Sequence, residues 1–134
     1  MTVSEDAWQW IASAERDRDT VQIILAAPRQ PYEIIAYHCQ QCAEKYLKAV
    51  FVQFDRKPPF IHDLRQLSRG VNRHCPEIAR VESDCERLTP FGTVTRYPGS
   101  VMEPGAEHMP QVTMWMENIR AAVRSCLDLD LESE

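Results

Sequence analysis

Apolar and polar residues follow one another along the chain with the 3.6-residue period of amphipathic helices. The first such segment runs from Ser4 to about Ala26, where charged side chains separate the apolar positions. Ser4 can act as an N-cap, because its hydroxyl can accept a hydrogen bond from an amide in the first turn. Pro28 must end the helix, since proline lacks an amide hydrogen and clashes with the preceding turn. The pattern therefore predicts a first helix over residues 4–26.

The second segment, from Tyr32 to about Phe54, contains neither glycine nor proline. Pro31 directly precedes it and can occupy the first turn of a helix, where a missing amide hydrogen costs nothing. The break that follows, residues 55–59, is polar and carries two prolines. We therefore predict a long, uninterrupted second helix.

Three further helices are predicted in the second half of the chain. His62 or Asp63 opens a short third helix, and the turn at Cys75–Pro76 separates it from a fourth helix that begins at residue 77. A fifth helix covers residues 108–129, which have a clear apolar face. The apolar stripe of the fourth helix consists of Ile78, Val81, Cys85 and Leu88.

Only residues 92–95 show a short and ambiguous alternation of the kind seen in strands. Residues 97–107 contain Pro-Gly pairs that interrupt a helix, so we predict a loop there. We therefore predict an all-α fold, an antiparallel up-and-down helical bundle of four main helices plus a short additional helix. It should form a single domain over residues 1–134, with a frayed acidic tail from about residue 128.

Composition places the chain among ordinary globular proteins, with 44% apolar and 26% charged residues. No apolar run approaches the roughly 20 residues that span a bilayer, and the N-terminus lacks the features of a leader peptide. We therefore expect a cytoplasmic protein that does not bind membranes. The five cysteines are odd in number and lack the dense spacing of a secreted disulfide scaffold, so we expect reduced thiols.

Charge is distributed unevenly along the chain, whose net charge is -5. Residues 37–74 carry seven Lys and Arg against three acids, whereas residues 77–134 carry five Arg against eleven acids. The overall negative charge argues against a protein that coats DNA through bulk electrostatics. An anionic ligand should instead meet the basic middle of the chain.

A Cys-x-x-Cys pair, Cys39 and Cys42, directly follows His38 and suggests metal or redox chemistry. On a helical wheel, however, both cysteines fall in the apolar arc with Ile35 and Tyr46, where a buried thiol behaves as a small hydrophobe. The sequence offers no second ligand pair with zinc spacing and no βαβ pattern typical of a thioredoxin-like protein. We interpret the cysteines as packing residues, with a metal site and a redox pair as the alternatives.

The same wheel gathers polar residues into a stripe on the second helix, namely Tyr37, His38, Gln41, Lys45 and Lys48, with Glu44 at its edge. An imidazole, a primary amide and two ammonium groups can bind a phosphate by charge and a base or sugar by hydrogen bonds. The alternatives are a solvated helix face and a surface that contacts a partner chain.

Two arginine–histidine pairs have the spacing of a nuclease motif, in which a histidine follows an arginine by four to six residues. They are Arg56 with His62 and Arg69 with His74. Chance alone yields about one such pair in a chain of this composition, so the two matches decide nothing.

Several short motifs occur in an order that resembles the HEPN domain family in its small bacterial form. The resemblance covers residues 5–127, and this chain has cysteine at two positions where the family usually has alanine. Those positions therefore call for a small packing residue. The motifs are Trp8 with Ala14 and Asp17, the segment 37–49, His62-Asp63-Leu64 and Arg96-Tyr97-Pro98.

The resemblance implies a bundle of antiparallel helices, often a homodimer, that works beside a minimal nucleotidyltransferase encoded as a separate chain. Such chains are substrate-binding subunits or the toxin half of a toxin-antitoxin module. We therefore expect a nucleotide- or RNA-binding subunit with no catalytic residue, no metal and no cofactor. The alternative is a metal-independent HEPN ribonuclease toxin, in which His62 or His74 would act as the general acid or base.

In the leading interpretation the polar stripe binds the ligand and the loop after the fourth helix closes over it. Arg96 would then form a forked contact with phosphate, and Tyr97 would stack on a base. The predicted ligand-binding residues are Tyr37, His38, Gln41, Lys45, Lys48, His62, Arg96 and Tyr97.

Overall fold

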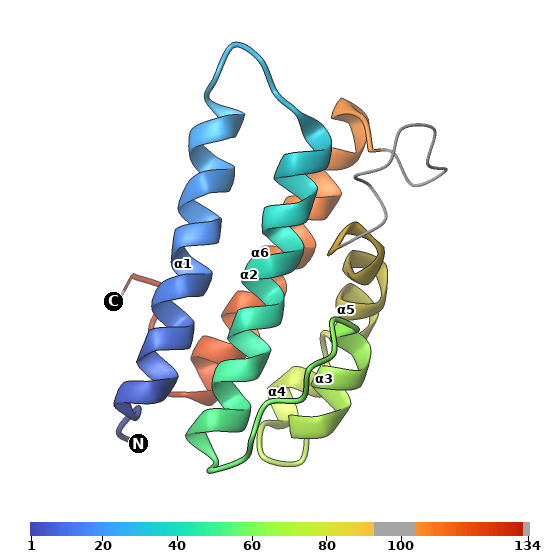
Figure 1. Cartoon of the computed structure of the whole chain (residues 1–134). Helices are drawn as coiled ribbons and strands as arrows, with labels where there is room; N and C mark the ends of the chain where they lie inside the picture. Colours follow the sequence, from blue (N-terminus) through green and yellow to red (C-terminus); the bar gives the residue numbers. More distant parts are fainter. Residues whose placement is uncertain (93–103, 133–134) are drawn as a thin grey trace.

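A computed structural model describes residues 1–92 and 104–132 of the chain. Every regular element in these residues is a helix, which confirms the predicted all-α fold (Figure 1). None of the described helices is both long and apolar enough to cross a lipid bilayer. The α-helices are α1 (Glu5–Leu25), α2 (Tyr32–Gln53), α3 (Leu64–Val71), α4 (Pro76–Ala79), α5 (Glu82–Leu88) and α6 (Met109–Cys126), and the described 3₁₀ turns are η1 (Thr89–Gly92) and η3 (Ala106–His108).

The predicted helix boundaries hold where the sequence carries a cap or a proline. Ser4 caps α1, its Oγ accepting a hydrogen bond of 3.1 Å from the amide of Ala7. Asp63 caps α3 in the same way, because its carboxylate accepts from the amide of Gln66 at 3.1 Å. Pro31 directly precedes α2, which ends where Asp55 adopts a positive φ of 58°.

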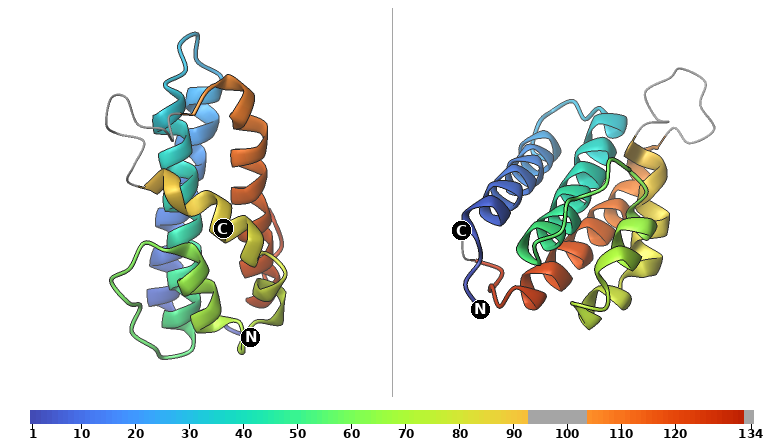
Figure 2. Two further views of the ribbon diagram at one scale, coloured as in Figure 1. Left: turned by 90° about the vertical axis from the view of Figure 1, so that its right-hand side faces the viewer. Right: turned by 60° about the horizontal axis from the view of Figure 1, so that its bottom comes forward.

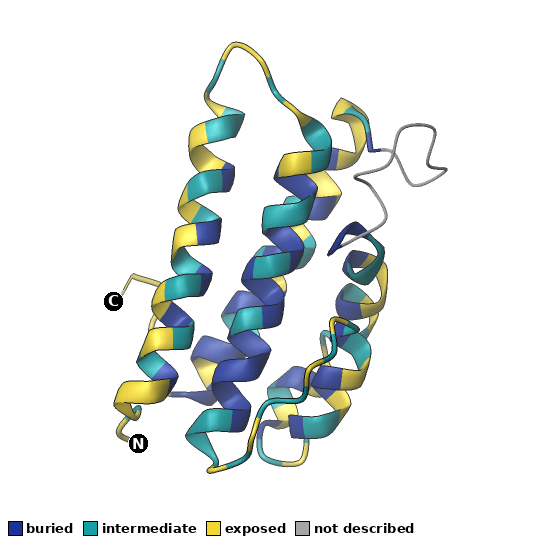
Figure 3. Ribbon diagram, viewed as in Figure 1, coloured by how far each residue is buried: buried dark blue, intermediate teal, exposed yellow. Residues whose placement is uncertain are grey.

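The helices α1, α2, α5 and α6 run in alternating directions, and the short α3 packs against α2 and α5 (Figures 1 and 2). Helix α2 occupies the centre, with α1 on one side and α6 on another. Its buried face carries much of the core, whereas α1 exposes a long outer face to solvent (Figure 3). Polar side chains outside the buried face of α2 can therefore reach α1 or the segment that leads into α3.

The prediction of a single fourth helix is wrong, because this part of the chain forms two short helices, α4 and α5. Val81 has φ of -110° and ψ of 17°, so the helix breaks there and α5 begins at the next residue. Part of the predicted loop at 97–107 forms the short turn η3, and residues 97–103 lie outside the described structure. Of the ambiguous strand at 92–95, only Gly92 is described, and it belongs to η1.

The chain after α6 is held against that helix by two arginines. Arg124 donates from Nε to the carbonyl of Asp130 at 2.6 Å, and Arg120 donates to the carbonyl of Leu131 at 2.8 Å. Leu127, directly after the helix, is fully buried. Residues 127–131 are therefore tied to the bundle, although they lie beyond its last helix.

The expectation that all the thiols are reduced is wrong for two of the five cysteines. Cys75 and Cys126 form a disulfide whose Cα atoms lie 5.4 Å apart. The fold brings them together because Cys75 directly precedes α4 and Cys126 is the last residue of α6, and these helices pack on one another. A contact across 51 residues of sequence has no signature in local periodicity.

Candidate functional site: the polar face of α2

The Cys-x-x-Cys pair is part of the core, as the wheel predicted. Cys39 and Cys42 are both 0% exposed and neither is in a disulfide. Burial raises the pKa of Cys39 to about 12 and raises that of Cys42 well above its ordinary value. A thiol in this environment stays protonated near neutral pH and is a poor nucleophile and metal ligand. In the described residues no three potential ligands gather where they could hold a metal ion.

Polar side chains gather where α2 contacts α1 and the segment 54–63. Most come from α2 itself, one comes from α1 and one from the segment before α3. We call this surface the α2 polar face; it consists of Asp17, Tyr37, His38, Gln40, Gln41, Glu44, Lys45, Lys48 and His62.

The first cluster on this face joins α1 to α2. Both oxygens of the buried Asp17 carboxylate are engaged: Oδ1 lies 2.8 Å from Nδ1 of His38, and Oδ2 lies 2.7 Å from Nζ of Lys45. His38 and Lys45 are seven residues apart, two helical turns, so both can reach one carboxylate on the neighbouring helix. Their side chains are each about a quarter exposed, at 26% and 25%. Asp17 therefore fixes an imidazole and an ammonium group at the solvent boundary.

The second cluster centres on Glu44, whose carboxylate is also buried. Its Oε1 lies 3.0 Å from Nδ1 of His62 and accepts from the amide of Gln40 at 3.2 Å, while Oε2 accepts from Lys48 at 3.1 Å. The i, i+4 spacing from Gln40 through Glu44 to Lys48 places the three side chains one above another on the helix. Gln40 also donates to the carbonyl of His62 at 3.1 Å. This cluster therefore fastens the segment before α3 to α2.

The close packing around Gln40 explains the glycine at position 92. A Cβ at Gly92 would lie 2.7 Å from Cδ of the Gln40 side chain, closer than carbon atoms approach without displacement. Gln40 cannot easily move aside, because its amide is bonded to both Glu44 and His62. Glycine at this position therefore preserves the Glu44 cluster.

Gln41 and Tyr37 complete the face between the two clusters. The Gln41 side chain donates to Oε1 of Gln40 at 2.8 Å, which leaves its own carbonyl oxygen as an acceptor. The Tyr37 ring meets that of His38 edge to face, with centroids 5.3 Å apart. Both side chains are half-buried, so the face presents hydrogen-bonding groups and one aromatic ring to solvent.

The charges on the α2 polar face cancel when the histidines are neutral, since the carboxylates of Asp17 and Glu44 match Lys45 and Lys48. Elsewhere in the basic middle segment, Arg65 and Arg69 pair with Glu82 of α5, whereas Lys57 and Arg73 are exposed cations. The charge of the α2 polar face itself is therefore balanced, although residues 37–74 as a whole carry an excess of positive charge. What the face offers a ligand is a fixed arrangement of donors and acceptors rather than a strong positive field.

Both histidines of the face have the same hydrogen-bonding arrangement. A carboxylate that accepts from Nδ1–H fixes the tautomer, and it leaves Nε2 as an acceptor in the neutral ring or a donor in the protonated ring. His62 is the more open of the two, with its side chain 64% exposed. Such an imidazole can hydrogen-bond to a base or phosphate, and it can also transfer a proton.

The structure brings together most of the residues predicted from sequence. Tyr37, His38, Gln41 and Lys45 line one face, and His62 adjoins them through Glu44. Lys48 also belongs to this face, but it is only 6% exposed, its ammonium bonds to Glu44, and the ring of Trp10 lies 6.0 Å away. The two loop residues of the prediction, Arg96 and Tyr97, lie outside the described residues.

Sequence reasoning gave no role in the site to the groups that hold it in place, namely Asp17, Glu44 and Gln40. The i, i+4 spacing of Glu44 and Lys48 was a usable signal, because such pairs commonly form on one helix face. The role of Asp17 had no local signal, since its partners are on another helix.

Neither arginine–histidine pair is assembled within the described chain. Arg56 donates to the carbonyl of Gly70, and Arg69 donates to Glu82 at 2.8 Å, so neither guanidinium is directed at its histidine. The His74 ring stacks on Phe54 with centroids 4.6 Å apart, and its Nε2 is buried. Of the two histidines in these pairs, only His62 is open to a ligand.

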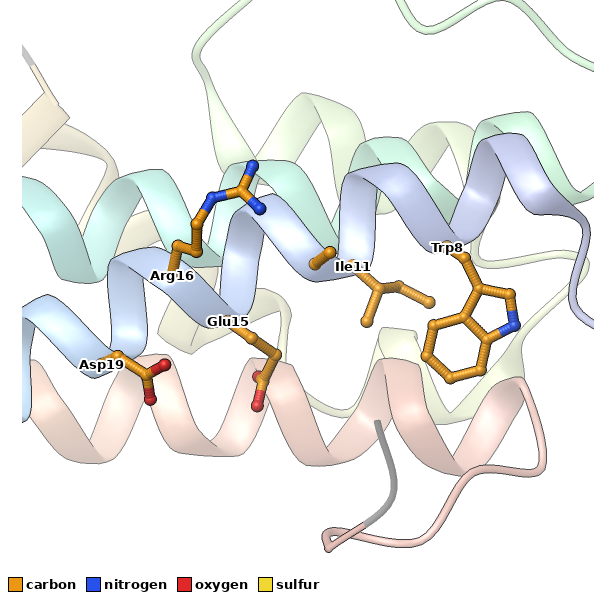
Figure 4. A pocket seen from close by; sticks show the side chains of 6 residues that line it. Trp8, Ile11, Glu15, Arg16 and Asp19 are labelled. Atoms are coloured by element: carbon orange, nitrogen blue, oxygen red, sulfur yellow. The ribbon is translucent and has the colours of Figure 1, made fainter.

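A groove of about 320 Å³ lies elsewhere, along the outer side of α1 near α6 (Figure 4). Its lining includes Trp8, Ile11 and the acids Glu15 and Asp19. Burial alone would raise the pKa of Glu15, but hydrogen bonds from Arg120 and Tyr46, together with the positive charges of Arg120 and Arg124, hold the pKa below its usual value. Because Glu15 serves to join α1 to α6, the groove is a weaker candidate for binding than the α2 polar face.

Comparison with known proteins returned one match. A sequence model of the HEPN domain matches residues 7–126, which is most of the chain and includes every described residue of the α2 polar face. No curated protein and no solved structure matches the chain.

Proposed function

Because the chain belongs to the HEPN domain family, we propose that it is a nucleotide- or RNA-binding subunit that pairs with a separate minimal nucleotidyltransferase in a toxin-antitoxin-type module. The observation that carries this proposal is the Asp17 cluster, which holds His38 and Lys45 at the solvent boundary of α2. Fixing two hydrogen-bonding groups in advance lowers the entropy cost of binding a small ligand.

The ligand contacts in this proposal are His38, Gln41, Lys45 and His62. Lys45 uses one bond to Asp17, and an ammonium group has three donors, so it retains donors for a phosphate oxygen. Gln41 and the histidines offer hydrogen bonds to a sugar or base. Lys48 supports the site by pairing with Glu44, and Arg96 and Tyr97 remain proposed contacts from the loop.

Pairing with a nucleotidyltransferase and formation of a homodimer are expectations that come from the family resemblance. A chain that holds a nucleotide or an RNA end without reacting with it is a natural partner for an enzyme that transfers nucleotides. The pairing is tested by co-expressing the chain with a minimal nucleotidyltransferase and measuring whether the two elute together on size exclusion.

The binding proposal is tested by titrating ATP and a short single-stranded RNA into the wild-type chain and into Lys45→Ala. We expect Lys45→Ala to bind each ligand several-fold more weakly. Arg80→Ala is the matched control, because Arg80 is an exposed cation at the end of α4, outside the α2 polar face. Equal affinity of Lys45→Ala and the wild type would reject the site assignment.

A metal-independent ribonuclease is the second candidate, and the contact between Glu44 and His62 favours it. The carboxylate orients the ring, so Nε2 of the exposed imidazole can accept a proton from a ribose 2′-hydroxyl. The 2′-oxygen then attacks the adjacent phosphate and displaces the 5′-oxygen of the next nucleotide, which takes up a proton from water. Incubation of single-stranded RNA with the purified chain in excess chelator tests this function. Cleavage by the wild type that is lost in His62→Ala would favour the enzyme, and intact RNA in both reactions would favour the binding subunit.

A further inference from the structure

The segment between α2 and α3, residues 54–63, is fastened to the bundle at both of its ends. Near its start, Arg56 donates to the carbonyl of Gly70 and its guanidinium lies 4.9 Å from the centre of the Phe51 ring. Near its end, the His62 carbonyl accepts from Gln40 at 3.1 Å. The path of the segment is therefore fixed by contacts with α2 and α3.

Between these two attachments the sequence is Pro58-Pro59-Phe60. Each proline fixes its own φ, and Pro59 also restricts the residue before it, so this part of the segment has little freedom. The Phe60 side chain is nevertheless 93% exposed. Burying a phenylalanine is strongly favourable, so a restrained segment that presents one to solvent forgoes that stabilisation.

Exposed polar residues lie on either side of Phe60 along the segment. Lys57 precedes it and is exposed, and His62 follows it on the α2 polar face. Pro58 and Pro59 are half-buried, and Ile61 packs against the core, so Phe60 is the one large apolar side chain that the segment exposes. In Figure 2 the segment stands out from the helices. A protein interface usually centres on several apolar side chains, whereas one ring beside hydrogen-bonding groups suits a nucleobase joined to a sugar and phosphate.

We propose that Phe60 is the stacking platform for the base of a nucleotide or single-stranded RNA end whose sugar and phosphate bind to the α2 polar face. This inference rests on the proposed binding function and names a residue that sequence reasoning did not single out. Every base has an aromatic face, so Phe60 contributes affinity with little preference among bases. A duplex, whose bases are already stacked, should bind poorly.

The test compares three variants in titrations with a short single-stranded oligo(A) RNA and with ribose 5-phosphate, which lacks a base. Phe60→Ala should weaken RNA binding at least about fivefold and leave ribose 5-phosphate binding unchanged. Phe60→Trp should keep the affinity, and its added fluorescence, measured as the difference from the wild type, should be quenched by RNA. Ile23→Ala is the control, because Ile23 is an exposed apolar residue on α1.

The outcomes separate this inference from the function on which it rests. If the wild type binds RNA and Phe60→Ala binds equally well, the stacking role is rejected and the binding function stands. If Phe60→Ala keeps its RNA affinity but no longer co-elutes with a nucleotidyltransferase, Phe60 belongs to a protein interface and the inference is overturned. If the wild type binds neither ligand, both the binding function and the stacking role are rejected.

Discussion

The Nδ1 atom of His38 on α2 lies 2.8 Å from Oδ1 of Asp17 on α1. The same carboxylate bonds to Lys45 through its other oxygen, so a buried acid on one helix orients two groups at the solvent boundary of the next. Glu44 likewise bonds to the exposed His62 and to the buried Lys48. Each side of the α2 polar face is thus organised by a carboxylate that a ligand need not touch.

Replacing Asp17 by asparagine should weaken both the fold and the site. The substitution keeps the size of the side chain but removes the charge shared by His38 and Lys45, and hydrogen bonds to charged groups contribute about 1.5–3 kcal/mol each. Because both partners are partly solvated, we expect a loss of about 1–2 kcal/mol in the free energy of unfolding in urea. Nucleotide affinity should fall several-fold.

Asp19→Asn is the matched control for this substitution, because Asp19 is an exposed acid on α1 that lines the outer groove. Its free energy of unfolding should remain within about 0.5 kcal/mol of the wild type. Equal stability of the two variants would contradict the role assigned to Asp17.

Lys48→Met should lower stability much more than it lowers ligand affinity. The substitution keeps the aliphatic stem but leaves the buried Glu44 carboxylate without its ammonium partner. Breaking one side of a buried ion pair costs about 3–5 kcal/mol, and since Glu44 retains Gln40 and His62 we expect the lower end of that range. Urea unfolding measures the loss, with the exposed Lys57→Met as control. A stable Lys48→Met with strongly reduced ligand affinity would instead make Lys48 a ligand contact.

The stability of the protein should depend on the ionisation of Glu15. Its pKa is lower in the folded chain than the ordinary 4.5, because the effect of burial is outweighed by hydrogen bonds from Arg120 and Tyr46 together with the positive charges of Arg120 and Arg124. A carboxyl group whose pKa is lowered by folding stabilises the folded state at pH values above its unfolded-state pKa. This contribution is lost as the pH falls through the folded-state pKa. The free energy of unfolding of the wild type should therefore exceed that of Glu15→Gln near neutral pH, and the difference should shrink on acidification below about pH 4.5. A difference that grows with acidification would contradict this account.

Titration with Ellman's reagent should distinguish the three free thiols from the two cysteines in the disulfide. In the native protein Cys39 and Cys85 should react very slowly at pH 8, because burial raises the pKa of each to about 12. After unfolding without reductant, three thiols should react, since Cys75 and Cys126 are joined. If the protein is reduced before it is unfolded, five thiols should react. Five reactive thiols without reduction would mean that the disulfide is absent.

The long helices could be predicted from sequence because their ends carry explicit signals. Ser4, Pro31 and Asp63 mark three starts, and the structure begins a helix directly after each of them. The break between α4 and α5 carries no glycine or proline, and Val81 continues the apolar spacing of Ile78 and Cys85. Periodicity alone therefore predicts one continuous helix across the break.

The site was only partly predictable, because a helical wheel describes one helix at a time. It grouped His38, Gln41 and Lys45 correctly, since these residues share one face of α2. It could not show that Lys48 is covered, which depends on Glu44 and on Trp10 from α1. It also suggested a basic stripe, whereas the charges of Lys45 and Lys48 are balanced by Asp17 and Glu44.

The four histidines of the chain provide the most direct test of the account, because two of them belong to the α2 polar face and two do not. Imidazole resonances should be followed by NMR while AMP or a short single-stranded RNA is added. The account predicts that the resonances of His38 and His62 shift and saturate at the same ligand concentration. The resonances of His74, which stacks on Phe54, and of His108 in η3 should not change. Shifts confined to His74 or His108, or no shift in any of the four, would contradict it.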